Sequence, residues 1–158
     1  MFGENLLDSY VMRGVFQAQP DKLRRDEALA WTMRWFAGHA MRLSVRRVDA
    51  GHSITVEPLL PPLPATDPVY RDLRSWLSVQ KSQAIPMHRR LGPDIDVKLS
   101  NRKGMVSLAL TSALPLDALT DRAVQLVNGV YKDFLYQPGR LTWVAGAFQI
   151  DPDSMVFF

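Results

Sequence analysis

The chain has 158 residues, of which 47% are hydrophobic, with 19 Lys and Arg against 16 Asp and Glu and no cysteine. This length provides one domain with a sizeable core, and the composition is that of an ordinary globular protein. The lack of cysteine excludes a disulfide scaffold, a thiolate metal site and a cysteine nucleophile.

The beginning of the sequence and its hydrophobic runs bear on localisation. The first residues, Met-Phe-Gly-Glu-Asn, contain no basic segment, and charges at Asp8 and Arg13 interrupt the apolar run that a secretory signal needs. No stretch approaches about 18 apolar residues without a charge, so no membrane-spanning helix is expected. We therefore expect a cytoplasmic protein.

Two helices are predicted in residues 1–40, which we interpret as a helical N-terminal segment. The first covers about 5–18, with Leu6, Leu7, Tyr10 and Val11 on one side. The second covers about 21–39, where Asp21 can cap the start and Gly38 can end the helix. Apolar residues recur in it at helical spacing, namely Leu29, Met33 and Phe36.

Residues 41–60 predict a β-hairpin with one wet face. Alternation places three residues inward, Met41, Leu43 and Val45, and three outward, Arg42, Ser44 and Arg46. A turn at 49–51 leads to a returning strand with Ile54 and Val56 inward.

The proline-rich stretch 61–68 admits two interpretations, a domain boundary or a crossover within one domain. We favour the crossover, because neither side has enough chain for its own core. Asp67 followed by Pro68 predicts a helix start, with a capping carboxylate and then proline at the first helical position. The helix carries an apolar face of Val69, Leu73, Trp76 and Leu77 and ends near residue 82.

Residues 94–111 predict a second hairpin, with a turn at 101–104. On the first strand Ile95, Val97 and Leu99 share one face, and on the second Val106, Leu108 and Leu110 do so. Pro115 ends this strand, because proline cannot donate to a ladder.

A long helix follows, capped by Asp117 or Thr120, and ends near residue 137. Its apolar stripe consists of Leu119, Ala123, Leu126, Val127, Val130 and Phe134. The stretch 140–150 is apolar on both faces, which predicts a buried final strand or an interface strand. An apolar tail, Met-Val-Phe-Phe, follows at 155–158.

This order of elements predicts an α+β fold in a single domain, 1–158. Hairpins dominate, so we expect a mostly antiparallel sheet of about five strands with helices packed on it.

The stretch 41–135 resembles the type III secretion chaperone-like superfamily. The resemblance rests on a helix, a strand set, a helix, a strand pair and then Leu-Pro-Leu-Asp-Ala-Leu at 114–119 leading into the last helix. It implies a chaperone-like fold, a polypeptide partner and frequent pairing of chains, and it carries over no functional residue. The second N-terminal helix, the apolar segment 140–158 and the slightly basic charge favour an uncharacterised relative over a true secretion chaperone.

The sequence contains no recognisable catalytic or cofactor motif. His39, His52 and His88 lack metal-ligand spacing. Asp94 and Asp96 lie on one strand face, which suits either a hard metal or a solvated surface, and we favour the surface. With no glycine-rich phosphate loop, we expect no metal, no nucleotide and no enzymatic activity; an enzyme with a site assembled only in space is the minor alternative.

Seven residues are candidates for partner binding: Arg42, Arg46, Arg47, Trp143, Phe148, Phe157 and Phe158. We interpret the protein as a polypeptide-binding, chaperone-like protein or assembly factor. The alternative is a nucleic-acid-associated protein that uses the three arginines, although no stacking aromatics interleave with them. The apolar strand and tail at 140–158 predict a homodimer, unless the tail folds back and covers the sheet.

Overall fold

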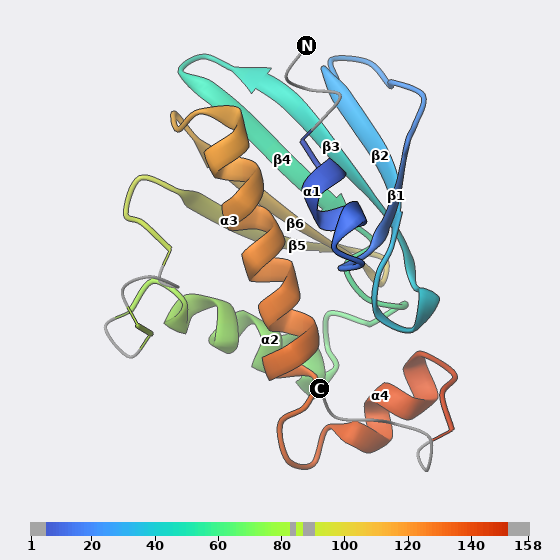
Figure 1. Cartoon of the computed structure of the whole chain (residues 1–158). Helices are drawn as coiled ribbons and strands as arrows, with labels where there is room; N and C mark the ends of the chain where they lie inside the picture. Colours follow the sequence, from blue (N-terminus) through green and yellow to red (C-terminus); the bar gives the residue numbers. More distant parts are fainter. Residues whose placement is uncertain (1–5, 83–84, 87–90, 152–158) are drawn as a thin grey trace.

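The computed structural model describes residues 6–82, 85–86 and 91–151. A six-stranded antiparallel sheet forms the centre of the fold, with α1 and α3 lying across one of its faces (Figure 1). The predicted α+β class is confirmed, with six strands where about five were expected. The elements are α1 (Asp8–Met12), β1 (Gln17–Pro20), β2 (Leu29–Arg34), the 3₁₀ turn η2 (Phe36–Gly38), β3 (Ala40–Val48), β4 (Gly51–Glu57), α2 (Pro68–Val79), β5 (Asp96–Arg102), β6 (Met105–Ser112), α3 (Leu116–Gly129), the π-helical turn η3 (Val130–Phe134) and α4 (Leu141–Ala147).

The strands are ordered β1-β2-β3-β4-β6-β5 across the sheet. Both predicted hairpins are present as β3–β4 and β5–β6, with Leu43 opposite Val56 and Leu99 opposite Leu108. The start of α2 is also as predicted, because the Asp67 carboxylate accepts a hydrogen bond of 2.9 Å from the Val69 N–H.

The predicted helix over 21–39 is wrong, because residues 29–34 form β2 and pair with β3. Helical spacing and strand alternation both fit this stretch, since Leu29, Trp31 and Met33 also alternate with more polar neighbours. Pairing with the neighbouring strand decides between the two patterns. The predicted helix over 5–18 shortens to α1, and residues 17–20 add β1 at the sheet edge.

The predicted strand over 140–150 is also wrong, because this stretch forms α4. Val144 and Ala145 are buried and face the core, whereas Gly146 is exposed. Spacing of Leu141, Val144 and Phe148 at i, i+3 and i+7 fits a helix that buries a single face. The tail at 155–158 lies outside the described residues.

The long helix α3 is confirmed with its apolar stripe, but its predicted caps are wrong. Pro115 occupies the N-cap position without a side-chain cap, and Asp117 lies in the first turn. The Thr120 hydroxyl is buried and donates to the Leu116 carbonyl at 2.7 Å. The helix continues into η3, where the hydrogen bonding widens to a π-helical turn.

The sheet packs on one face only. Register places the buried strand residues on the face that α3 covers, including Leu43, Val45, Ile54, Val56, Leu108 and Leu110. The opposite face carries small and hydroxyl side chains, namely Ser44, Ser53, Thr55, Ser107, Ala109 and Thr111. Among the described residues, no helix is long and apolar enough to cross a bilayer.

Candidate functional site

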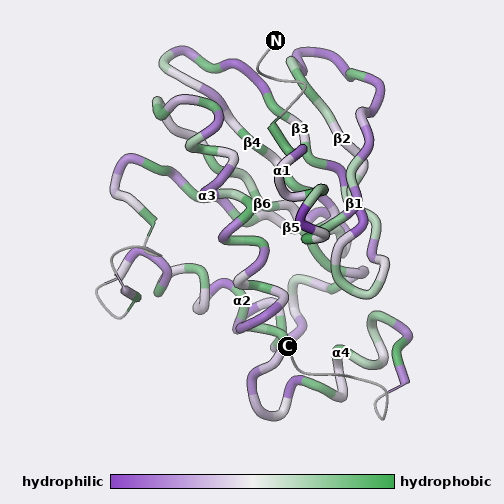
Figure 2. Tube along the Cα trace, viewed as in Figure 1, coloured by the Kyte–Doolittle hydropathy of each residue, from purple (hydrophilic) through white to green (hydrophobic). Residues whose placement is uncertain are grey.

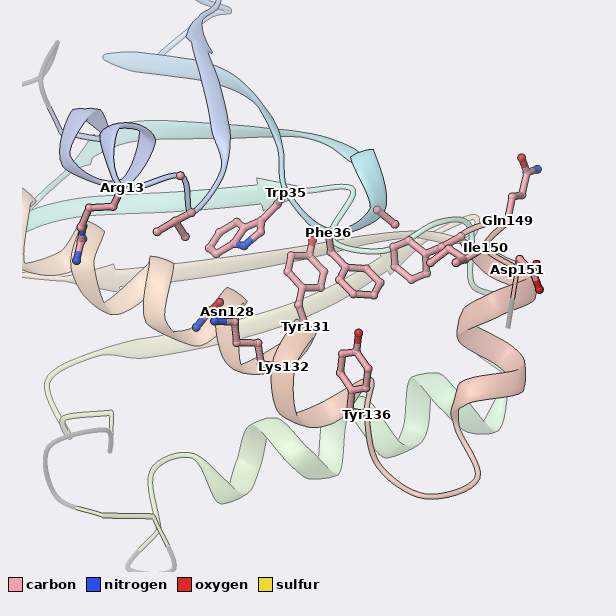
Figure 3. A pocket seen from close by; sticks show the side chains of 14 residues that line it. Arg13, Trp35, Phe36, Asn128, Tyr131, Lys132, Tyr136, Gln149, Ile150 and Asp151 are labelled. Carbon is pink, nitrogen blue, oxygen red and sulfur yellow. The ribbon is translucent and has the colours of Figure 1, made fainter. Parts of the chain in front are cut away.

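A cavity of about 920 Å³ lies between the end of α1, the η2 turn, the end of α3 and the segment after α4 (Figure 3). Its size falls within the range of known ligand pockets. We call it the aromatic pocket because five of its lining residues are aromatic: Trp35, Phe36, Tyr131, Tyr136 and Phe148.

Tyr131 is central among the pocket aromatics. Its ring stacks on Phe36, with centroids 5.5 Å apart, and meets Trp35 edge-on at 5.6 Å. Its hydroxyl donates to the Leu59 carbonyl at 2.9 Å, and burial raises the pKa of Tyr131 well above its ordinary value. The phenol therefore stays neutral and serves as a rigid wall of the pocket.

The π-helical turn η3 carries Tyr131 and is fixed from outside the pocket. The Trp76 indole N–H of α2 donates to the Asp133 carboxylate at 3.0 Å. Below it, Arg140 donates to the Phe134 carbonyl and to the Asp72 carboxylate, each at 2.9 Å. Single π-helical turns inside α-helices recur at functional sites.

The η2 turn places the other side of the pocket. Ala37, with φ 52°, and Gly38, with φ 70°, are both left-handed and reverse the chain after β2. Phe36 is buried against Tyr131, and its ring meets Phe148 edge-on at 5.0 Å. A left-handed alanine is strained, and such strain is concentrated at ligand and switch sites.

The pocket lining also contains two cations, Arg13 and Lys132, and one acid, Asp151. Arg13 lies over the Tyr10 ring at 5.0 Å and donates to the Ser9 carbonyl at 3.1 Å. Figure 3 shows Arg13 and Asp151 at opposite ends of the pocket, with Lys132 nearer to Arg13. The charge of the lining is therefore polarised along its length.

A second hollow of about 510 Å³ adjoins the aromatic pocket and shares Ala37, Phe148 and Gln149 with it. His39 lines this hollow and donates from Nε2 to the Pro58 carbonyl at 2.8 Å. Burial lowers the pKa of His39, which favours the neutral ring. The two hollows together form an elongated groove, with the Phe148 side chain at their junction.

The three predicted arginines do not form one patch. Arg42 is engaged by the hydrophilic loop between β1 and β2 (Figure 2): it donates to Asp21 at 2.8 Å and to Glu27 at 2.6 Å. The hydrogen bonds from Arg42 lower the pKa of Glu27 to about 2. Arg46 is exposed on the open face, whereas Arg47 alternates to the other face of the strand.

The predicted pair Trp143 and Phe148 does come together, with ring centroids 6.4 Å apart and perpendicular planes. Both rings are half-buried, and Phe148 lines the pocket. Phe157 and Phe158 lie outside the described residues.

Sequence analysis did not select Trp35, Phe36, Tyr131 or Tyr136 as site residues. The alternation of 29–35 could have revealed the strand that ends at Trp35, but nothing local pairs Trp35 with Tyr131. Asp94 and Asp96 are both exposed, and His88 lies outside the described residues. Within the part of the chain that the structure describes, no group of three or more His, Asp or Glu side chains is arranged to hold a metal ion.

Comparison with known proteins adds no functional assignment: neither a protein-family model nor a curated protein matches this chain.

Proposed function

We propose that the protein binds a polypeptide and works as a chaperone-like protein or assembly factor rather than as an enzyme. The aromatic pocket carries this proposal. Aromatic side chains are enriched at the buried centres of protein interfaces, where a few of them supply most of the binding energy.

The shape of the groove favours a chain segment over a compact small molecule. The aromatic pocket continues into the second hollow past Ala37 and Phe148, so a ligand that fills both must be long. An extended peptide can place alternate side chains into two such hollows while its backbone stays near water.

The charges of the lining favour an apolar segment with acidic neighbours. Arg13 and Lys132 lie toward one end of the pocket and Asp151 at the other. We therefore infer a partner whose aromatic or aliphatic side chains enter the pocket while an Asp or Glu meets the cationic end.

The order of elements supports the chaperone-like part of the proposal. A helix, a strand set, α2, the β5–β6 pair and α3 follow one another as in the superfamily that the sequence resembles. Fold alone does not fix function, so this support is secondary to the pocket. The homodimer also remains a prediction, and the change of 140–150 from strand to helix removes the apolar strand that first suggested it.

Fluorescence anisotropy with three labelled peptides of equal length tests the function. One peptide has two phenylalanines flanked by aspartates, the second has the same phenylalanines flanked by lysines, and the third has serines in place of the phenylalanines. We expect the first to bind most tightly and the third not to bind.

Two surface variants locate the binding. Lys132→Glu, at an exposed pocket position, should reduce the preference for the acidic peptide at least tenfold, which corresponds to about 1.4 kcal/mol. Arg46→Glu, exposed on the open sheet face, is the matched control and should change nothing. Equal affinity for all three peptides, or loss of binding in the Arg46 variant alone, would contradict the proposal.

Nucleic acid is separated from a peptide partner by salt. Phosphate contacts release counterions, so the affinity for an oligonucleotide should fall steeply as salt rises, whereas apolar binding should not. A steep salt slope that Arg46→Glu reduces would favour the nucleic-acid alternative.

A further inference from the structure

The end of α4 directs the chain back toward the aromatic pocket. Gln149 is left-handed, with φ 56°, and the Ile150 N–H donates to the Ala145 carbonyl at 2.8 Å. With the Gln149 N–H near the Gly146 carbonyl at 3.4 Å, this is the Schellman arrangement that reverses a chain after a helix. As a result, Ile150 and Asp151 line the pocket.

The residues that come next in the sequence match the pocket in chemistry. They read Pro-Asp-Ser-Met-Val-Phe-Phe, 152–158, and the last four are apolar. Phenylalanine rings gain from edge-on contacts with other aromatics, and methionine sulfur gains from aromatic edges. Asp153 supplies the negative charge that complements Arg13 and Lys132.

The segment is also long enough. Seven extended residues reach at most about 23 Å, whereas a sphere with the volume of the pocket is about 12 Å across. Asp151 lies at one end of the pocket and Arg13 at the other, so the segment starts at one end and has length to spare (Figure 3).

We propose that residues 152–158 occupy the aromatic pocket of their own chain when no partner is bound. The proposal rests on the proposed function in one respect: a partner peptide must displace this segment. A short tether gives an effective concentration in the millimolar range, so even a weak intrinsic affinity fills the pocket in cis. Occupation then lowers the apparent affinity for a partner by the fraction of open pockets, about tenfold if one pocket in ten is open.

The lack of native cysteine allows a direct proximity test in the full chain. Asn128→Cys, in the pocket lining, is combined with Met155→Cys, and disulfide formation under mild oxidation is followed on non-reducing gels. The control combines Met155→Cys with Thr55→Cys on the open sheet face.

We expect the Asn128 pair to cross-link at least tenfold faster than the control pair and within one chain. Equal rates for the two pairs would overturn the proposal. A cross-link found between two chains would also overturn it, because the occupant would then be the segment of a second copy.

A second measurement separates this inference from the proposed function. Phe157→Asp with Phe158→Asp weakens the segment in the full chain, and the acidic phenylalanine peptide is titrated as before. Tighter peptide binding by about tenfold is the expected result. Unchanged peptide affinity together with no Asn128 cross-link refutes the inference and leaves the proposed function standing. A rapid Asn128 cross-link without any peptide binding supports the inference and refutes the peptide-binding function.

Discussion

Truncation of two buried leucines should destabilise the protein by different amounts. Leu108, on β6, is fully buried, with Val56 and Leu99 opposite it on the strands to either side. Leu126, on α3, is 5% exposed and lines a hollow of about 670 Å³ between α2 and α3. Alanine therefore leaves an enclosed void at one position and a void open to water at the other.

The magnitudes follow from this difference. Leucine-to-alanine changes lose the transfer free energy of the side chain plus a term that grows with the cavity left behind, about 2.7–5.0 kcal/mol in total where a core cannot collapse. Because hydrogen-bonded strands flank Leu108, we expect Leu108→Ala to cost about 4–5 kcal/mol. Water can enter the hollow beside Leu126, so we expect about 2–3 kcal/mol for Leu126→Ala.

Urea denaturation followed by tryptophan fluorescence measures both costs. With a slope of about 2 kcal/mol per molar urea, Leu108→Ala should lower the midpoint by about 2 M and Leu126→Ala by about half as much. Leu23→Ala is the control, because Leu23 is 52% exposed and should contribute less than about 0.5 kcal/mol. A larger loss for Leu126→Ala than for Leu108→Ala would refute the assignment of the enclosed face.

Three further predictions concern the backbone, pH and metal content. Gly51→Ala should destabilise by about 3 kcal/mol or more, since its Cβ would lie 2.0 Å from the Ser112 carbonyl oxygen, whereas Gly146→Ala meets nothing within 4 Å and should be neutral or stabilising in thermal melts. The folded pKa of Glu27, about 2, lies below its ordinary 4.5, so its bond to Arg42 stabilises the fold above about pH 4.5 and is lost as pH falls through about 2; Glu27→Gln should remove this slope and about 1–2 kcal/mol at pH 7, as urea midpoints measured from pH 7 to 2 would show. Elemental analysis should find no stoichiometric metal, and about one metal ion per chain would contradict this.

The parts of the fold that could be predicted are those where one periodicity stands alone. In 41–56 and 95–110, apolar residues alternate at period two and fit no helix, and both hairpins follow. In 119–134 the spacing fits a helix and no strand. Asp67 before Pro68 identifies a helix start from chemistry that is local to two residues.

The errors arise where two periodicities coexist. Leu29 and Met33 are four apart, which fits both a helix and a strand, and only the edge of β3 decides. For 140–150, a run that seems apolar on both sides contains Ala145, Gly146 and Ala147, whose small side chains allow a helix to bury one face and expose the other. Tertiary contact overrides local preference in both stretches.

The candidate site was harder to predict than the fold. Phe148 was selected from its apolar surroundings, but Trp35 and Tyr131 meet only because β2, η2 and η3 converge in space. The three arginines were selected as one group, yet the loop before β2 engages Arg42, and the pleat separates Arg46 from Arg47.

The sheet that packs on one side also has an evolutionary consequence. On each central strand, every second residue lies in the core and is constrained by volume, whereas its neighbours, such as Thr55 and Thr111, lie on the uncovered face. Substitutions there open no cavity and strand no buried polar group, so selection for stability leaves them largely free. Lineages of this protein can therefore diversify one whole surface, and acquire new contacts on it, while the pocket on the opposite side keeps its geometry.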